Sequence, residues 1–211
     1  MSPTLIEGWP ARLAAVGATA AQFPVDQLPE IAFVGRSNCG KSSLLNRLVN
    51  QRHLARVSKR PGCTRDVLFF HVWQRWYFVD LPGYGFARID QRQRAVWERG
   101  IGHYLSQRRQ LRAVILLFDL RRGVTDIDQQ MLNYLGQHGI PFLPVATKSD
   151  QLGSNDRRQA LTRLTGQLQQ PGYLAIAAPL AVSSLNGTGM PELRQMLHRI
   201  LAGEGDGTGS D

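Results

Sequence analysis

The stretch over residues 30–50 constrains the fold more than any other part of the chain. Residues 30–34, Glu-Ile-Ala-Phe-Val, form a mostly apolar run that is typical of a buried strand. A glycine-rich string, Gly-Arg-Ser-Asn-Cys-Gly-Lys-Ser, follows at residues 35–42 and has the spacing of a loop that wraps phosphate groups in backbone N–H groups. Leucines at helical spacing then predict a helix over 41–50, whose N-terminus would face the same anion. This order predicts an α/β phosphate-binding domain; an ordinary glycine-rich turn is the alternative.

The side chains of this loop have distinct expected roles in holding a triphosphate. Lys41 would place an ammonium on the β- and γ-phosphate oxygens, and the Ser42 hydroxyl would ligate Mg²⁺. Glycine allows the tight curve where a Cβ would clash. The predicted phosphate-binding residues are Gly35, Arg36, Ser37, Asn38, Cys39, Gly40, Lys41, Ser42 and Ser43.

A second string, Thr-Lys-Ser-Asp at residues 147–150, follows another apolar run and predicts a guanine-binding loop. The Asp150 carboxylate can accept from both the N1–H and the exocyclic amine of guanine, whereas adenine would leave this charge unpaired. The Lys148 stem can lie along the plane of the base. The predicted base-binding residues are Thr147, Lys148, Ser149 and Asp150, with Val182, Ser183 and Ser184 after the last apolar run. GTP or GDP is therefore the predicted ligand.

The segment between these strings supplies candidate groups for the metal and the γ-phosphate. Asp80 ends an apolar run and would hold Mg²⁺ through water, while the Gly83 N–H would meet the γ-phosphate. Thr64 is the candidate second hydroxyl on Mg²⁺, with an ordinary loop threonine as the alternative. The further predicted ligand-binding residues are Gly62, Cys63, Thr64, Arg65, Asp66, Asp80, Leu81, Pro82 and Gly83. The predicted metal ligands are Ser42, Thr64 and Asp80, and the predicted catalytic residues are Lys41, Asn38, Thr64 and Gly83.

The motifs together resemble those of translation-factor-class GTPases, and more closely those of the EngB (YihA/YsxC) family of bacterial GTP-binding proteins. The likeness runs from about residue 30 to about residue 201, and its motifs lie at residues 35–38, 40–43, 61–64, 80–85, 119–121, 128–131, 147–150 and 183–185. Cys63, Arg65 and a short connection near Gln74 depart from the family pattern. The resemblance implies a single P-loop domain that acts in assembly of the large ribosomal subunit, with a link to cell division and septation. The implied partner is a large-subunit precursor, both its rRNA and its ribosomal protein.

The residue after Gly83 bears on the rate of hydrolysis. Many small GTPases position the attacking water with a glutamine there, whereas this chain has Tyr84, which predicts slow intrinsic hydrolysis. In related GTPases an asparagine at the position of Asn38 helps to bind K⁺, which can offset the charge that builds on the phosphates. Two alternatives stay open: Asn38 stabilises only its own loop, or a partner surface orders the site.

The alternation of predicted strands and helices indicates an α/β domain, and the resemblance implies that it is a three-layer P-loop NTPase domain, like a small GTPase. Its sheet has about six mostly parallel strands with one antiparallel edge strand and helices on both faces. The predicted strands lie near 30–35, 66–73, 76–80, 112–119, 141–147 and 173–182, and the predicted helices near 41–50, 92–108, 127–138, 156–169 and 190–201. We expect an N-terminal extension over 1–29 that packs on the domain, the GTPase domain over 30–202, and a disordered tail over 203–211.

Charge and cysteine content narrow the partners and the compartment. The net charge of +9 and the arginine-rich stretch over 88–122 suit a phosphate-rich partner such as rRNA, with a solvated basic face as the alternative. The two cysteines fall in nucleotide-binding loops, which favours reduced thiols in the cytoplasm. No stretch approaches membrane length, so we expect no membrane partner. We also expect a monomer. A nucleotide-gated binding module with incidental hydrolysis and a small-molecule kinase are the competing functions, although a kinase gives no account of residues 147–150.

Overall fold

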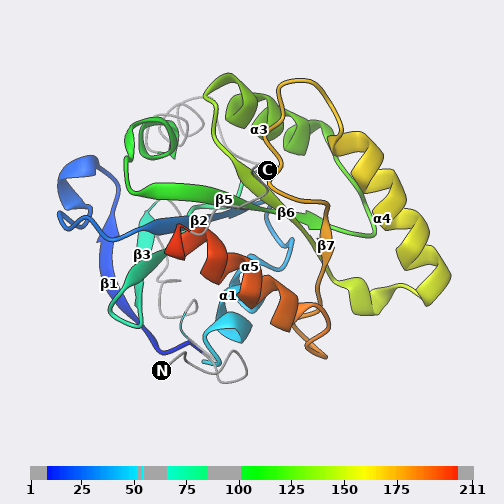
Figure 1. The fold of residues 1–211 in the computed structure, drawn as a ribbon, viewed down its shortest axis with the longest axis horizontal. Coiled ribbons are helices and arrows are strands. Elements are labelled where there is room, and N and C mark those ends of the chain that lie inside the picture. The colour runs from blue at the N-terminus through cyan, green and yellow to red at the C-terminus, as the bar shows by residue number, and fades with distance from the viewer. Residues whose placement is uncertain (1–8, 52–53, 55–65, 85–100, 204–211) are drawn as a thin grey trace, which may run out of the picture.

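A seven-stranded sheet organises the chain, with strand order β1-β3-β4-β2-β5-β6-β7 (Figure 1). The computed structural model describes residues 9–51, 54, 66–84 and 101–203. The strands are β1 (Ala11–Gly17), β2 (Glu30–Gly35), β3 (Val67–Val72), β4 (Trp76–Asp80), β5 (Leu111–Asp119), β6 (Phe142–Thr147) and β7 (Leu180–Ala181). Neighbours from β4 to β7 pair in parallel, whereas β3 runs antiparallel to both β4 and β1. The predicted mostly parallel sheet with an antiparallel edge is confirmed.

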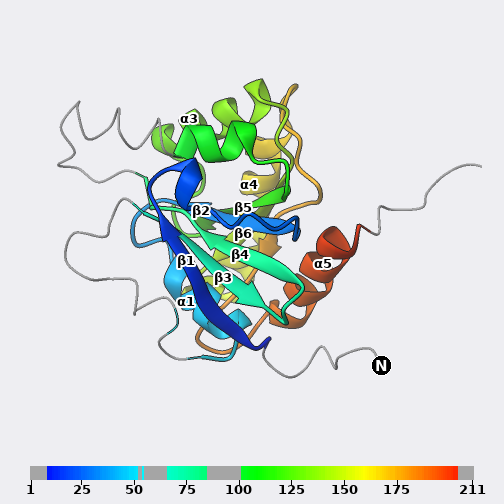
Figure 2. The same cartoon turned by 90° about the vertical axis from the view of Figure 1, so that its left-hand side faces the viewer.

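Helices cover both faces of the sheet, and Figure 2 shows the two layers on either side of it. The helices are α1 (Lys41–Leu48), α3 (Asp126–Gln137), α4 (Ser154–Leu168) and α5 (Met190–Ala202), with short 3-10 turns η1 (Ala20–Gln22) and η2 (Ser149–Gln151). Residues 101–107 are also helical, and the rest of the helix predicted over 92–108 lies outside the described residues. One apolar core joins the sheet to α3, α4 and residues 101–107, and a second joins it to α1 and α5. Every residue of β2 is buried because it is covered on both faces.

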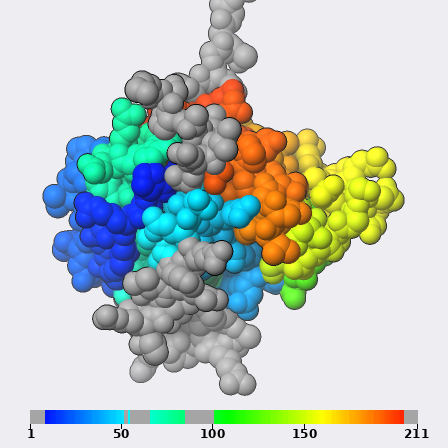
Figure 3. Space-filling model, turned by 90° about the horizontal axis from the view of Figure 1, so that it is seen from below, coloured from blue at the N-terminus to red at the C-terminus, as the bar shows by residue number. Residues whose placement is uncertain are grey.

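The helices α1 and α5 lie side by side on their face of the sheet, where Figure 3 shows them in cyan and orange. Arg194 of α5 donates to the carbonyls of Arg47 (3.0 Å) and Leu48 (3.4 Å) at the end of α1. These bonds satisfy acceptors that a helix C-terminus leaves without intrahelical partners. The packing therefore fixes α1, and with it the loop that precedes α1.

The edge strand β1 is an addition to the strands that the sequence predicts. Its sequence, Ala-Arg-Leu-Ala-Ala-Val-Gly, carries three alanines, so its alternation of apolar and polar residues is weak. Pairing with β3 gives it hydrogen-bond partners, and Trp9, just before it, is fully buried. The Trp9 ring lies 5.1 Å from Trp73, 6.0 Å from Trp76 and 5.5 Å from Phe78, between centroids. Residues 9–17 are thus part of the sheet and its core.

The last predicted strand, over 173–182, is much shorter in the structure. Only Leu180–Ala181 forms β7, and Ala175 makes an isolated bridge to Phe142. Prolines at 171 and 179 and a glycine at 172, which has φ +89°, interrupt an extended ladder here. Of the disordered tail predicted over 203–211, Gly203 is described as the C-cap of α5, and residues 204–211 lie outside the described residues.

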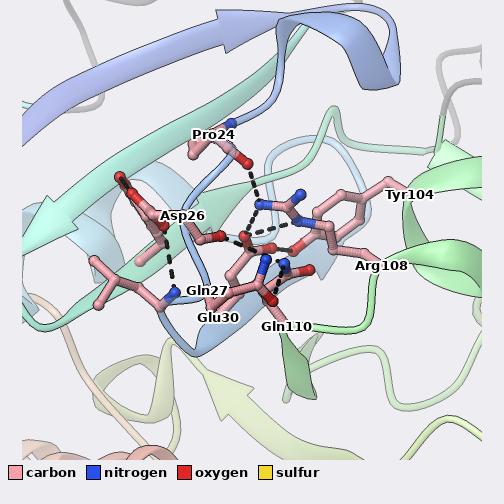
Figure 4. A network of polar contacts seen from close by, with 9 residues as sticks. Pro24, Asp26, Gln27, Glu30, Tyr104, Arg108 and Gln110 are labelled. Carbon is pink, nitrogen blue, oxygen red and sulfur yellow. Dashed lines mark hydrogen bonds and ion pairs between the residues drawn. The ribbon is translucent and has the colours of Figure 1, made fainter.

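The end of the sheet opposite the glycine-rich loop is closed by a buried polar network (Figure 4). Glu30, which is fully buried, accepts from the Tyr104 hydroxyl (2.8 Å) and from Arg108 (2.9 Å to Nε and 2.5 Å to Nη2). Arg108 also donates to the carbonyl of Pro24 (2.8 Å). Desolvation raises the pKa of Glu30, and the bonds from Arg108 and Tyr104 oppose that shift. The network joins three segments at the start of β2.

Candidate nucleotide-binding site

The carboxyl ends of the parallel strands all lie at the same end of the sheet, which is called the nucleotide edge below, and the predicted site residues meet there. β2 ends at Gly35, β4 at Asp80, β6 at Thr147 and β7 at Ala181. Because these strands are neighbours, the phosphate-binding string, the Asp-x-x-Gly string and the guanine-binding string lie side by side. Ligands of open α/β sheets bind at this edge.

The loop over residues 36–40 has the backbone of a phosphate-binding loop. Asn38 (φ +64°) and Gly40 (φ +101°) are both left-handed, and Gly40 is the N-cap of α1. A Cβ on Gly35 would lie 2.6 Å from Cys39 Sγ and 3.0 Å from Leu117 Cβ, so only glycine fits. The Cys39 thiol is buried inside this curve, and desolvation raises its pKa to about 11. Cys39 therefore acts as a small packing residue of the loop rather than as a reactive thiolate.

The loop is held from behind by β6. Thr147 Oγ1 lies 2.5 Å from the carbonyl oxygen of Cys39 and 3.0 Å from that of Phe118. The Lys148 ammonium donates to the carbonyl of Asn38 (2.7 Å). In a trans peptide the C=O and the next N–H point in opposite directions, so the Gly40 N–H points away from β6. The backbone thus turns carbonyls toward the protein and leaves an N–H available to an anion.

Lys41, Ser42 and Asp80 bring a cation and two oxygen ligands to the same end of the loop. The Lys41 ammonium forms an ion pair with Asp80, and both side chains are mostly buried. Ser42 lies in the first turn of α1, and Ser43, next to it, is exposed. Gly83 lies against the loop, because a Cβ there would be 3.2 Å from the carbonyl oxygen of Gly35. Gly83 therefore packs against the phosphate-binding loop, and the contact of its N–H with the γ-phosphate stays a prediction.

These residues fit a magnesium nucleotide. A hydroxyl and a carboxylate are the hard oxygen ligands that Mg²⁺ takes, and it uses few protein ligands together with phosphates and water. Across residues 9–51, 54, 66–84 and 101–203, no three His, Cys, Asp or Glu residues cluster as a metal site of their own. The donor set therefore suits an ion that arrives with phosphates better than an all-protein cage.

The guanine-binding string is ordered by buried contacts. The Ser183 hydroxyl donates to Asp150 Oδ1 (2.5 Å) and itself accepts from the N–H groups of Leu185 and Asn186 (both 3.2 Å). The Ser149 N–H donates to the carbonyl of Val182 (3.2 Å). Lys148 has φ +59°, which turns its side chain back across the loop. The predicted residues 147–150 and 182–184 are therefore brought together.

Asp119 and Arg121 lie beside the predicted site; the sequence placed residues 119–121 among the motifs of the resemblance but gave them no role in ligand binding. The Asp119 carboxylate at the end of β5 accepts from Lys148 (2.8 Å), from two side-chain nitrogens of Arg121 (2.8 and 2.6 Å) and from the Arg121 backbone N–H (3.2 Å). Desolvation favours a raised pKa at Asp119, but the bonds from Arg121 and Lys148 prevail and hold the pKa well below its usual range. The available signal was an acid that ends an apolar strand, the same signal that identified Asp80.

Part of the predicted site lies outside the described residues. This part comprises Gly62, Cys63, Thr64 and Arg65, so the proposed second hydroxyl on Mg²⁺ stays a prediction. Asp66 is described and comes just before β3. Because β3 is antiparallel and Leu68 pairs with Asp80, Asp66 lies at the same edge as the other site residues.

Within the described ranges, none of the helices combines the length and the apolar character that crossing a membrane requires.

Comparison with known proteins identifies the family. A family model described as 50S ribosome-binding GTPase matches residues 30–148. The chain is 42% identical over 195 residues to a probable GTP-binding protein EngB of Shouchella clausii, covering 92% of this chain and 98% of that protein. A probable GTP-binding protein EngB of Syntrophomonas wolfei is 40% identical over 191 residues, with 90% and 96% covered.

Solved structures agree on the fold. A crystal structure of a probable GTP-binding protein engB aligns with TM-score 0.67 at 22% identity, over 82% of this chain and 99% of that one. Translation elongation factor SelB from Methanococcus maripaludis, in complex with the GTP analogue GppNHp, aligns with TM-score 0.59 at 16% identity. That match covers 83% of this chain and 34% of the SelB chain. The relatives in sequence, the family model and the shared fold lead to one conclusion: the chain belongs to the EngB family of GTP-binding proteins and carries its GTPase domain.

Proposed function

We propose that this protein binds GTP and GDP with Mg²⁺, hydrolyses GTP slowly, and acts as a switch in assembly of the large ribosomal subunit. One observation carries the nucleotide part of the proposal. A loop suited to phosphates and a loop suited to guanine share one edge of the sheet, and Thr147 joins them. One loop suits the phosphates and the other suits the guanine, so the two together fit a single guanine nucleotide, whereas either loop alone would fit only one end of it.

The roles of the residues follow from their contacts. Ser183 holds the Asp150 carboxylate in place for the two N–H donors of guanine. Lys41 would exchange its Asp80 partner for phosphate oxygens and so hold them in line. Gly83 would donate its N–H to the γ-phosphate. Ser42, Asp80 and, from the sequence, Thr64 would hold Mg²⁺, which when bound offsets the negative charge on the phosphates.

The low intrinsic rate is supported by Tyr84. Its hydroxyl donates to the buried Asp128 (2.7 Å), so it is not available to orient a water on the phosphate side. Asn38 is exposed at the rim of the phosphate-binding loop, which is compatible with a role in binding K⁺ next to the β- and γ-phosphates. Hydrolysis would then require K⁺ or a partner surface.

Base recognition gives the test of the nucleotide proposal. We expect wild-type protein to bind GTP and GDP but not ATP, and Asp150→Asn to lose guanine and gain xanthine, because an amide can donate to the additional oxygen of xanthine. Competition against a fluorescent guanine nucleotide measures this.

Single-turnover hydrolysis in KCl should exceed that in NaCl, and Asn38→Ala should remove the difference. A variant that still prefers guanine contradicts the role of Asp150, and an equal response to K⁺ in both proteins contradicts that of Asn38.

The ribosomal role rests on the family and on charge. The matching family model is described as a 50S ribosome-binding GTPase. Arg121 and Arg122 are exposed just beyond the nucleotide edge, whereas Arg109 and Arg112 are exposed near the other end of β5. Arginines at the nucleotide edge suit contact with phosphate groups there. We propose that the protein acts as a monomer in the cytoplasm. Its effect on cell division and septation would follow from the supply of ribosomes.

Co-sedimentation tests that partner. Purified protein with a non-hydrolysable GTP analogue should pellet with large-subunit particles and should be released with GDP, in buffers of fixed salt because phosphate contacts weaken as salt rises. Small-subunit particles are the control. Equal pelleting with both particles, or in both nucleotide states, would favour non-specific binding by a basic protein and contradict the proposed switch. The alternative, a binding module with incidental hydrolysis, predicts that the large subunit leaves the single-turnover rate unchanged.

A further inference from the structure

The backbone of Tyr84 is bound to the phosphate-binding loop. Its N–H donates to the carbonyl of Gly35 (3.3 Å), and its carbonyl accepts from the N–H (3.0 Å) and the hydroxyl (3.4 Å) of Ser37. A Cβ on the preceding Gly83 would lie 3.4 Å from both Ser37 N and Ser37 Oγ. The turn at Gly83 is therefore packed directly against the loop.

The side chain of Tyr84 runs the other way, into the core on the α3 and α4 face. Only 6% of the residue is exposed, and its hydroxyl donates to Asp128 Oδ1 (2.7 Å). Asp128 lies in the first turn of α3 and is 3% exposed. Its other oxygen accepts from the N–H (3.0 Å) and the hydroxyl (2.6 Å) of Thr125, the N-cap of α3. Burial, and then the Asp128 charge, raise the pKa of Tyr84 well above its usual value, so the hydroxyl keeps its proton and remains a donor.

These contacts make one continuous connection from the phosphate-binding loop to the start of a helix. Thr125 and Asp128 form a capping box, so the acceptor for Tyr84 is fixed by the helix itself. An anchored Tyr84 restricts the turn that presents Gly83. A turn that is already ordered loses less conformational entropy when a ligand binds it.

We propose that the Tyr84 hydroxyl, held by Asp128, is a positioning group for Gly83 that strengthens the binding of GTP relative to GDP. The proposal rests on the nucleotide-binding function proposed above. GTP carries the γ-phosphate that Gly83 would receive, whereas GDP does not reach it, so ordering the turn favours only the triphosphate. Tyr84 acts through Gly83 and is not a catalytic residue.

The variant Tyr84→Phe tests the proposal, because it removes the hydroxyl and keeps the ring in the core. Dissociation constants for GDP and for guanylyl imidodiphosphate, a non-hydrolysable GTP analogue, are measured with Mg²⁺ by calorimetry. We expect the analogue to bind about tenfold more weakly, equivalent to about 1.4 kcal/mol, with GDP unchanged. The proposal is tested by the ratio of the dissociation constant for the analogue to that for GDP, compared between Tyr84→Phe and wild type.

The chain offers a matched control in Tyr104. This tyrosine is 1% exposed and its hydroxyl donates to another buried carboxyl group, Glu30 Oε2 (2.8 Å), at the far end of β2. Tyr104→Phe makes the same chemical change away from the nucleotide. It should lower the melting temperature of the protein and leave the ratio of the two dissociation constants as in wild type. If Tyr84 had only a structural role, Tyr84→Phe would likewise lower the melting temperature and leave the ratio of the two dissociation constants unchanged.

A second variant separates the remaining outcomes. Asp128→Ala should shift the ratio in the same direction, and Tyr84→Phe combined with Asp128→Ala should shift it no further, because one change removes the acceptor and the other the donor of the same bond. A ratio unchanged in Tyr84→Phe, shifted equally in Tyr104→Phe, or moved toward the triphosphate overturns the inference. Failure of the wild type to bind either guanine nucleotide would instead overturn the proposed function.

Discussion

At the scale of single residues, Asp119 is the least expected member of the site. It is buried at the end of β5 and holds the ammonium of Lys148, which also donates to the carbonyl of Asn38. The carboxylate thus fixes the side chain whose stem is expected to lie along the guanine ring. Since GTP and GDP share that ring, we expect Asp119 to affect the binding of both nucleotides alike.

Asp119→Asn should therefore weaken GTP and GDP about equally, by roughly tenfold, because it removes one charge-assisted bond to Lys148. Calorimetry on both nucleotides measures this, with the exposed Asp126→Asn as a control of equal charge change. A shift of the GTP-to-GDP ratio would contradict this role for Asp119.

The stability of the same variant should depend on pH in a defined direction. The pKa of Asp119 is lowered in the folded protein, so its contribution is fully present above the unfolded value of about 3.9 and is lost as the pH falls toward the folded value. The difference in unfolding free energy between wild type and Asp119→Asn should accordingly be largest near neutral pH and shrink below about pH 4. Urea titrations at several pH values measure it, and a difference that grows on acidification would contradict the assigned pKa shift.

At the scale of elements, β1 depends on a side chain that precedes it. The Trp9 side chain is fully buried against Trp73, Trp76 and Phe78, and its backbone N–H donates to the carbonyl of Leu48 (3.4 Å). It therefore attaches the edge strand both to the β3–β4 hairpin and to the end of α1. Without β1, the hydrogen-bonding groups along β3 would form an open edge.

Trp9→Ala should destabilise the protein by about 3–5 kcal/mol, the range for removing a large buried aromatic side chain. Urea denaturation measures this, and Val25→Ala, at a residue that is 93% exposed, is the control expected to change little. A loss no greater than that of the control would show that β1 does not rely on Trp9.

At the scale of the whole molecule, the sequence was sufficient where local pattern and tertiary structure agree. The buried run of β2, the loop after it and α1 follow directly from apolar periodicity and glycine spacing. The strand β1 did not, because alanines give little pattern and its partner β3 is distant in sequence. The predicted strand over 173–182 was too long because prolines and a glycine outweigh its apolar residues. The contacts of Asp119 and Tyr84 depend on which strand ends become neighbours in the sheet. The spacing of motifs along the sequence does not determine that order.

The contact between Thr147 and Cys39 has a consequence for how a nucleotide leaves. The buried Thr147 hydroxyl, 2.5 Å from the Cys39 carbonyl oxygen, joins β6 to the loop before α1. We therefore expect these two segments to stay together when a nucleotide is released. A factor that accelerates nucleotide exchange would then act on residues 80–84 or on the turn after β7 rather than on the junction of β6 and the loop.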